Sequence, residues 1–257
     1  MNHQKRRANA KVPVLLALLA VSAAALLLQT LPRGEQAEIA AERARRLALV
    51  QLGRPLPGTP DLASLPDRLA AHGLRLGAPV FIRIFKREFA LELWMLRDGR
   101  FHLFETYPVC RWSGWLGPKL VQGDKQAPEG FYSVDAGALN PSSRWHRSFN
   151  LGFPNVYDRA HGRTGTFLMV HGGCSSTGCF AMTDPVIDEI WRLVGAALKG
   201  GQPRFHVHVF PFSMTDANME RHAASPWASF WRQLKAGSDA FERTLLPPQV
   251  QVCNRRY

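Results

Sequence analysis

A histidine and a cysteine stand eight residues apart in the segment 171–179, which reads His-Gly-Gly-Cys-Ser-Ser-Thr-Gly-Cys. A free thiol has a pKa of about 8.5 and is mostly protonated at neutral pH, so a nucleophilic cysteine needs a neighbouring base or cation. His171 is such a base, because the apolar run 167–170 predicts a strand that ends at the imidazole. The Ser-Thr-Gly turn then presents Cys179. The pair predicts covalent acyl transfer, with Cys179 as nucleophile and His171 as general base.

Two glycines complete the predicted site. The backbone N–H groups of Gly178 and Cys179 are the expected donors to the oxyanion that forms on attack, an effect of about 10² to 10³ in rate per donor. A glycine at position 178 also permits close approach of the backbone. Since the segment has no carboxylate beside the base, we expect the carbonyl of Gly172 or Gly173 to orient the imidazole of His171.

The cysteines leave several possibilities open. The chain has four, and in an exported protein they could form two disulfides. We do not expect a bridge that includes Cys179, because a Gly-Cys turn after a strand-borne histidine is a poor place for a structural crosslink. Cys174 is close enough in sequence to form a redox pair with Cys179, or it is a small loop residue. The roles of Cys110 and Cys253 stay open as well.

A metal site is the rival chemistry. His206 and His208 project to the same face of a predicted strand, and with His171 and a cysteine they could bind zinc. No carboxylate with clear ligand spacing accompanies them, and a His-x-His pair on a half-buried strand is commonly structural. We therefore expect neither a metal nor another cofactor, because a thiol and an imidazole suffice for acyl transfer.

Composition limits the partners. The 257 residues, 46% of them hydrophobic, predict one catalytic core. The formal charge of +12 indicates an anionic partner, which could be nucleic acid, a phospholipid surface or a carboxylate-rich polymer. Nucleic acid is not expected, because no zinc-finger spacing, phosphate-binding glycine loop or RNA-binding strand motif is present.

The N-terminal sequence predicts export. Basic residues at positions 5, 6, 7 and 11 precede the uncharged apolar run 12–28. The small residues at 22–25 favour cleavage of a signal peptide, whereas the leucines at 26–28 favour an inner-membrane anchor, and both remain open. Because the basic flank stays in the cytoplasm, the chain after residue 31 is predicted to lie in the periplasm.

Helices and strands follow in order. Residues 35–52 predict a charged helix that ends before the proline-bearing linker 54–60, and a second short helix is predicted over 65–72. From Pro79 the apolar period becomes two, which predicts strands. The predicted strands cover residues 80–85, 91–96, 101–107 and 131–134, with an Asp-Gly turn at 98–99 and a polar loop at 140–150.

The sequence after the 171–179 segment predicts two more helices around a strand. Asp184 is the expected N-cap and Pro185 the first-turn proline of a helix that ends before Gly200. Residues 205–210 alternate as a strand. Ser225-Pro226 is expected to begin a helix with an inward aromatic face, formed by Trp227, Phe230, Trp231 and Leu234.

The 171–179 segment resembles the signature of the YkuD-type L,D-transpeptidases, a His-Gly followed by Ser-His-Gly-Cys-Ile-Arg-Met. Two positions differ, since Thr177 replaces the motif histidine and Ala181 replaces the arginine. The matching positions are Cys179 (nucleophile), His171 (general base), Gly178, Ser176 and Met182.

The wider sequence is similar to the YafK-like branch of that family, in which Gly-Cys-Phe/Tyr-Ala-Met is the expected motif. The resemblance runs from about Leu76 to the C-terminus. It includes residues 116–119 (Leu-Gly-Pro-Lys), 123–130 (Gly-Asp-Lys-Gln-Ala-Pro-Glu-Gly), 139–143 (Leu-Asn-Pro-Ser-Ser) and 150–155 (Asn-Leu-Gly-Phe-Pro-Asn).

The resemblance implies a mainly β (α+β) fold, a catalytic β-sandwich with packed helices. We accordingly divide the chain into a signal peptide or membrane anchor at 1–31, a helical spacer at 32–75, a catalytic domain at 76–215, and a C-terminal helical extension with a terminal strand at 216–257.

The resemblance also implies the reaction. The thiolate attacks an amide of a diaminopimelate-containing wall peptide and forms a thioester. An amine acceptor gives a crosslink or protein attachment, and water gives cleavage. The YafK-like branch is associated with release of an outer-membrane lipoprotein from peptidoglycan, so a hydrolase (amidase) is the alternative. A further alternative is an inactive peptidoglycan-binding module.

Loss of the motif arginine removes a guanidinium that would hold a substrate carboxylate in bidentate fashion. Either another cation replaces it or the substrate differs. The predicted substrate-binding residues are Ser176 and Thr177 of the motif and the cations Lys119, Arg144, Arg147 and Arg163.

Overall fold

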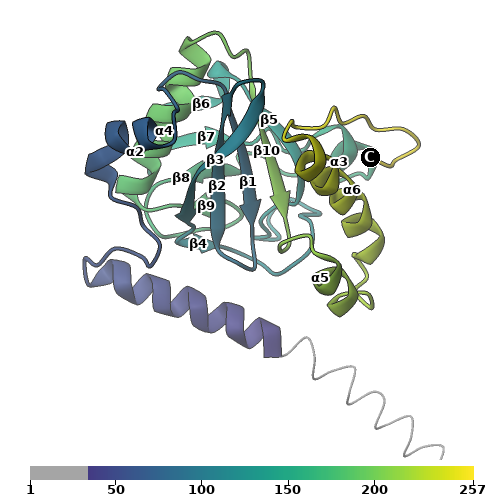
Figure 1. Ribbon diagram of the computed structural model, residues 1–257. Helices are drawn as coiled ribbons and strands as arrows, with labels where there is room; N and C mark the ends of the chain where they lie inside the picture. Colours follow the sequence, from purple (N-terminus) through teal and green to yellow (C-terminus); the bar gives the residue numbers. More distant parts are fainter. Residues whose placement is uncertain (1–33) are drawn as a thin grey trace, which may run out of the picture. The chain divides into compact units, whose positions relative to one another are not determined.

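The computed structural model describes residues 34–257, so the predicted signal or anchor at 1–31 lies outside the described residues. Within the described residues the chain divides after residue 44, and residues 45–257 form one compact unit. Residues 34–51 are helical, as the Ala, Glu, Arg and Leu content predicts. No helix in the described range 34–257 has both the length and the apolar character needed to cross a membrane. Residues 45–257 have an α+β fold with two mixed sheets (Figure 1).

The first sheet has the strand order β3-β2-β1-β10-β5. Three consecutive strands form the predicted antiparallel meander, and the turn at Asp98 and Gly99 has positive φ at both residues, as an Asp-Gly hairpin requires. β1 also pairs in parallel with β10, which brings residues 80–85 and 205–210 together. The strands are β1 (Val80–Phe85), β2 (Ala90–Arg97), β3 (Arg100–Pro108), β5 (Gly130–Val134) and β10 (Phe205–Phe210).

The second sheet has the order β4-β9-β8-β7-β6. Its strands are β4 (Arg111–Trp112), β6 (Leu139–Ser143), β7 (His146–Asn150), β8 (Met169–His171) and β9 (Phe180–Ala181). The predicted loop at 140–150 is therefore wrong, because most of it forms the β6–β7 hairpin. This segment forms strands despite its polar composition because β7 pairs with β8 and Phe149 is buried against Phe205.

The helices lie in two groups, one on each side of the strands in Figure 1. They are α2 (Leu65–Ala71), α3 (Val156–Ala160), α4 (Asp184–Lys199), α5 (Asp216–Arg221) and α6 (Ala228–Thr244), with 3-10 turns η1 (Leu62–Ser64) and η2 (Ala136–Ala138). Thr183, not Asp184, is the N-cap of α4, so the predicted cap is wrong by one residue. This frees the carboxylate of Asp184 for the 171–179 segment.

The predicted aromatic face of α6 packs against the first sheet. Phe230, Trp231 and Leu234 are buried in one cluster with Phe210, the last residue of β10, and with Phe212, which follows that strand. Residues 45–257 form one compact unit, which includes both predicted ranges, 76–215 and 216–257. Instead of a terminal strand, the last residues form an isolated bridge between Cys253 and Arg256.

A fully buried ion pair fixes the long loop between β4 and β5. The Lys86 ammonium, just after β1, lies 2.8 Å from a carboxylate oxygen of Glu129 and also donates to the carbonyls of Gly117 and Ala127. Glu129 accepts further hydrogen bonds from Gly117 N–H and from the indole of Trp231. Both charges are thus compensated by several partners, as burial of ions requires.

Removal of one partner of this pair should destabilise the fold strongly. Lys86→Met leaves the Glu129 carboxylate buried without its counter-ion, and we expect the free energy of unfolding to fall by about 3–5 kcal/mol. Lys235→Met, which removes the surface pair with Asp239, is the matched control with an expected loss below about 1 kcal/mol. Chemical denaturation compares the two variants, and equal small losses would contradict the prediction.

Candidate active site

Strand pairing places His171 and Cys179 on one face of the second sheet. β8 and β9 are parallel, with Val170 opposite Phe180 and His171 opposite Ala181. Val170 and Phe180 are fully buried, so the alternate residues His171 and Cys179 face the other side. If the same register extends by one residue, Cys179 lies beside Met169, roughly 6.6 Å along the strand from His171.

The thiol of Cys179 lies at the start of this strand pair and is half-buried. Its Sγ accepts a hydrogen bond from Met169 N–H at 3.4 Å and donates to the Phe167 carbonyl at 3.5 Å. Burial raises the pKa of the thiol, and the Met169 N–H and the charge of Lys119 offset only part of that shift. The thiol is therefore protonated at neutral pH and needs a base to react.

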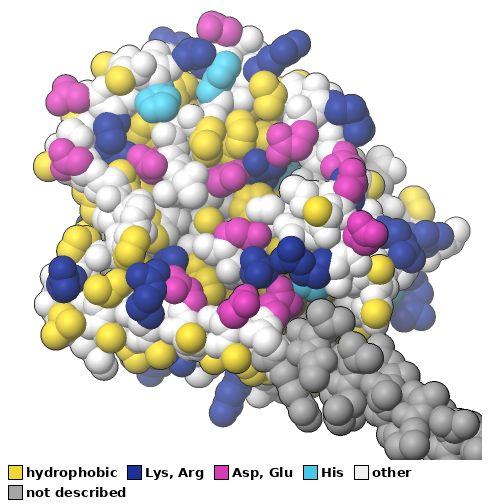
Figure 2. All heavy atoms as spheres, turned by 60° about the horizontal axis from the view of Figure 1, so that its bottom comes forward, with side chains coloured by type: hydrophobic (Ala, Val, Ile, Leu, Met, Phe, Trp, Pro, Cys, Tyr) yellow, Lys and Arg dark blue, Asp and Glu magenta, His cyan; other side chains and the backbone are white. Residues whose placement is uncertain are grey.

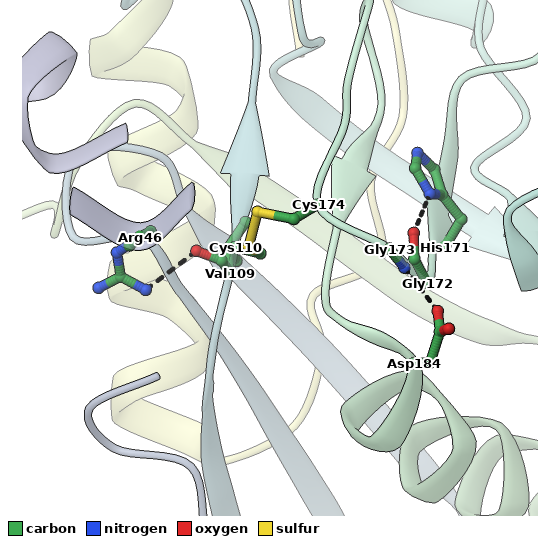
Figure 3. Close-up of a disulfide and its surroundings, with 8 residues drawn as sticks. All are labelled: Arg46, Val109, Cys110, His171, Gly172, Gly173, Cys174 and Asp184. Atoms are coloured by element: carbon green, nitrogen blue, oxygen red, sulfur yellow. Dashed lines mark hydrogen bonds between the residues drawn. A yellow bond between two sulfur atoms is a disulfide. The ribbon is translucent and has the colours of Figure 1, made fainter. Parts of the chain in front are cut away.

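The imidazole of His171 is prepared as that base. It is 2% exposed, and Nδ1 donates to the Gly172 carbonyl at 2.6 Å, the orientation that the sequence analysis anticipates (Figure 3). Since a carbonyl only accepts, Nδ1 carries the proton and Nε2 of the neutral ring keeps its lone pair. Burial lowers the pKa of His171, against smaller opposing effects of Gly172 O and Asp184. The ring is thus a neutral proton acceptor at neutral pH.

Glycine is required at position 172. A Cβ there would lie 2.4 Å from a carboxylate oxygen of Asp184 and 3.0 Å from the carbonyl of Trp145. The same Asp184 oxygen accepts the Gly173 N–H at 2.7 Å, so the first residue of α4 holds the chain just after the base (Figure 3). The indole of Trp145, half-exposed, lies over His171 with its ring centroid 6.0 Å away. Sequence reasoning missed both contacts.

Two serines form hydrogen bonds with the turn that precedes Cys179. Gly178, at φ +124°, donates its N–H to Ser113 Oγ at 2.6 Å and to Ser176 Oγ at 3.3 Å. Ser176 Oγ in turn donates to the carbonyl of Cys179 at 2.7 Å. The Gly178 N–H is therefore engaged within the protein, and the N–H of Cys179 is the remaining candidate for an oxyanion donor. Ser176 acts here on the backbone, and Thr177 is exposed at the tip of the turn.

A disulfide joins this loop to the end of β3. Cys174 is bonded to Cys110, 64 residues earlier, while Cys179 and Cys253 are free thiols (Figure 3). This settles the open role of Cys174, which does not pair with the nucleophile. A disulfide that closes a loop of this length lowers the conformational entropy of the unfolded chain, which stabilises the folded state by about 4 kcal/mol.

The four predicted substrate-binding cations have different surroundings. Lys119 is buried and pairs with Asp124, and Arg163 is buried and pairs with Asp158 at 2.8 Å, so the fold explains both without a substrate. Arg144 and Arg147 belong to the β6–β7 hairpin segment that also carries Trp145. Arg147 pairs with Asp188 on α4, and Arg144 lies over the indole of Trp145. Their role toward a substrate remains a prediction.

Sequence reasoning missed a fifth cation. Arg111 on β4 lies directly opposite Ala181 on β9, and Ala181 lies opposite His171 on β8. Because facing residues share one side of a sheet, Arg111, Ala181 and His171 form a row across three strands. Arg111 is half-buried and has no ion-pair partner within residues 34–257. Nothing in the local sequence of 108–114 signals this placement, which comes from strand pairing alone.

The rival metal site does not assemble in the described part of the chain. There, no group of three or more His, Cys, Asp and Glu side chains is placed to hold a metal ion. His208 packs edge-on between Phe81 and Phe131, with ring centroids 4.7 and 4.6 Å away. His206 lies on the same strand face and is exposed.

The pKa shift of the thiol has a measurable consequence. Iodoacetamide reacts with the thiolate, so a raised pKa lowers the alkylation rate at a given pH. We expect the pH midpoint for alkylation of Cys179 to be higher in folded protein than in protein unfolded in urea, with peptide mapping to separate Cys179 from Cys253. A midpoint in folded protein at or below the unfolded value would instead indicate a preformed thiolate–imidazolium pair.

Comparison with known proteins identifies the family. No family model matches the chain. The chain is 52% identical over 182 residues, 71% of its length and 74% of theirs, to the proteins named "Putative L,D-transpeptidase YafK" from Escherichia coli K12 and from E. coli O157:H7. Among solved structures, this chain is similar to the helical cell shape determining protein Pgp2 (K307A mutant) from Campylobacter jejuni. The match has 18% sequence identity and covers 71% of this chain and 66% of the Pgp2 chain. Its TM-score of 0.44 is too low to support an argument. By its sequence identity and coverage, the chain belongs to the L,D-transpeptidase family, as a YafK-like member.

Proposed function

We propose that this protein is a peptidoglycan-modifying enzyme that acts on diaminopimelate-containing wall peptides through a cysteine thioester. One observation carries the proposal: a protonated, half-buried thiol and a neutral imidazole share one face of two paired strands, and the hydrogen bond to Gly172 leaves Nε2 of His171 as the base. The family of the chain supports the substrate class.

The proposed reaction has two steps. Nε2 of His171 accepts the thiol proton as Sγ of Cys179 attacks a peptide carbonyl, and the Cys179 N–H stabilises the oxyanion. The C–N bond then breaks, and the imidazolium returns its proton to the leaving amine, which leaves a thioester. In the second step an acceptor loses a proton to His171 and displaces the thiol. An amine acceptor gives a new amide, as in transpeptidation, and water gives a free acid, as in release of a lipoprotein.

A neutral pair suits this chemistry. If thiolate and imidazolium formed in the resting enzyme, the ions would have to be held in a half-buried site, and the direction of both pKa shifts opposes this. Proton transfer is therefore coupled to attack, so charge develops mainly on the carbonyl oxygen and on the imidazole. The catalytic gain then depends on how firmly His171 is oriented, which is the role of Gly172.

Compartment and substrate charge fit this proposal. The Cys110–Cys174 disulfide supports an oxidising compartment such as the periplasm, in agreement with the predicted export signal. On the face in Figure 2, basic side chains lie beside acidic ones and do not form one continuous basic field. Recognition of a wall carboxylate is therefore assigned to individual cations, and we choose Arg111, which lies in the same cross-strand row as His171 and has no ion-pair partner in the described range.

The thioester is tested directly with defined muropeptides, some of them carrying a lipoprotein fragment. We expect Cys179→Ala to abolish product formation and His171→Ala to slow it by at least about 10²-fold, because each removes a reacting group. Cys253→Ala is the matched control and should retain full activity, since that thiol is exposed elsewhere in the chain. Mass spectrometry of the products separates amide from acid. Turnover by folded Cys179→Ala protein would exclude the mechanism.

The assignment of Arg111 is tested by substitution at that position. Arg111→Gln should raise KM for peptides with a free carboxylate about tenfold while kcat changes little, since one charge-assisted contact is lost. Arg111→Lys keeps the positive charge at this position and should recover part of the loss. Steady-state kinetics measures both effects. An unchanged KM in folded Arg111→Gln protein would reject the role.

A further inference from the structure

A cavity of about 460 Å³ lies beside the edge strand β5, away from the residues that contact the thiol. It is half open to solvent and is lined by residues of β5, β10, α3 and the chain segment 248–257, which passes beside α3 (Figure 1). Tyr257 fixes this segment, because its hydroxyl accepts a hydrogen bond from the Asn155 amide at 3.0 Å. Neither His171 nor Cys179 lines the cavity, so it is distinct from the candidate active site.

The strand face that lines the cavity contains an unpartnered polar atom. His206 faces Ser133 and His208 faces Phe131 across the β10–β5 pair, and all four line the cavity. His208 is 1% exposed, and its Nδ1 has no hydrogen-bond partner within residues 34–257. A buried polar atom without a partner costs about 1–3 kcal/mol. Because this nitrogen is itself buried, a ligand in the cavity would contact the exposed ring of His206 on the same strand face instead.

The charged side chains of the lining, two arginines, have one sign. Arg159 and Arg204 line the cavity, and no aspartate or glutamate does. Some guanidiniums of this fold pair with carboxylates, such as Arg68 with Glu189, Arg83 with Glu92 and Arg163 with Asp158. Arg159 and Arg204 have no such partner in the described range. Arg159 is held by a hydrogen bond to the Pro154 carbonyl, which fixes one guanidinium at the cavity.

Part of the lining is apolar. Val250, Val252 and Tyr257 contribute to it. The volume falls within the range of about 300–1,000 Å³ that is typical of small-molecule sites, in which a few polar groups orient a mostly apolar contact. Two guanidiniums without carboxylate partners and an apolar part of the lining together favour an organic anion.

We propose that this cavity is a second binding site, for a small organic acid whose carboxylates contact Arg159 and Arg204 and whose apolar part lies against Val250 and Val252. Wall peptides with free carboxylates belong to this class, and that choice of natural ligand rests on the proposed function. The site would hold a peptide of the wall while the thiol acts on another bond.

The test is a binding measurement on the full chain with the thiol site blocked by the substitution Cys179→Ala, so that this site forms no adduct. The probe is a diaminopimelate-containing tripeptide with free carboxylates, titrated by calorimetry. We expect Arg204→Gln and Arg159→Gln each to weaken binding about tenfold, as does amidation of the peptide. Arg75→Gln, an exposed arginine outside the cavity, is the matched control and should change Kd less than about twofold. Thermal unfolding checks that each variant is folded.

Three results would overturn the proposal: absence of binding, equal binding by the arginine variants, and equal binding of the amidated peptide. Inorganic phosphate that binds as tightly as the tripeptide would reject the assignment to an organic acid. Turnover of muropeptides is measured separately on unblocked protein. Binding without turnover would count against the proposed function alone, and turnover without this binding would count against the second site alone.

Discussion

The buried pair of Lys86 and Glu129 is the interaction on which the arrangement of the site depends. It connects the end of β1, the loop between β4 and β5, and the indole of Trp231 on α6. Two buried charges are tolerated only because backbone carbonyls, a backbone N–H and the indole satisfy their remaining hydrogen bonds. The pair fixes Gly117 and Ala127 within a loop that begins at Ser113, and Ser113 in turn supports the nucleophile turn.

That turn is held from three separate elements. Ser113 accepts the Gly178 N–H from the side of β4, the disulfide ties Cys174 to Cys110 at the end of β3, and Asp184 accepts the Gly173 N–H from the first turn of α4. A loop with glycines at 172, 173 and 178 would otherwise be flexible, since glycine has the largest conformational freedom. Acyl transfer needs the base and the thiol in a fixed geometry, and misplacement by about 1 Å can cost 10²-fold in rate. The supports therefore matter as much as the reacting groups.

Local sequence signals predicted the elements whose residues are neighbours in the chain. Strands 80–85 and 205–210 agree with the structure residue for residue, because alternation of apolar side chains is a local property. The candidate nucleophile and base were recognisable for the same reason. The β6–β7 hairpin was missed because its polar residues are stabilised by pairing with β8, which composition does not record. Arg111 and Ser113 were missed because only the pairing of β4 with β9 brings them to a loop more than sixty residues away.

The distribution of charge near the thiol follows from the same pairing. Position 181 holds an alanine where the family signature has an arginine, and Ala181 is fully buried between two strands. Ala181, in the middle of the row Arg111–Ala181–His171, has a short side chain and adds no charge there. The guanidinium of the row therefore comes from the neighbouring strand, at Arg111. Lys119 cannot take this role without leaving Asp124, and Arg163 cannot without leaving Asp158 inside the core. A buried ion pair is broken only at a cost of several kcal/mol, so an unmatched guanidinium on the sheet is the less costly source of positive charge for a substrate carboxylate.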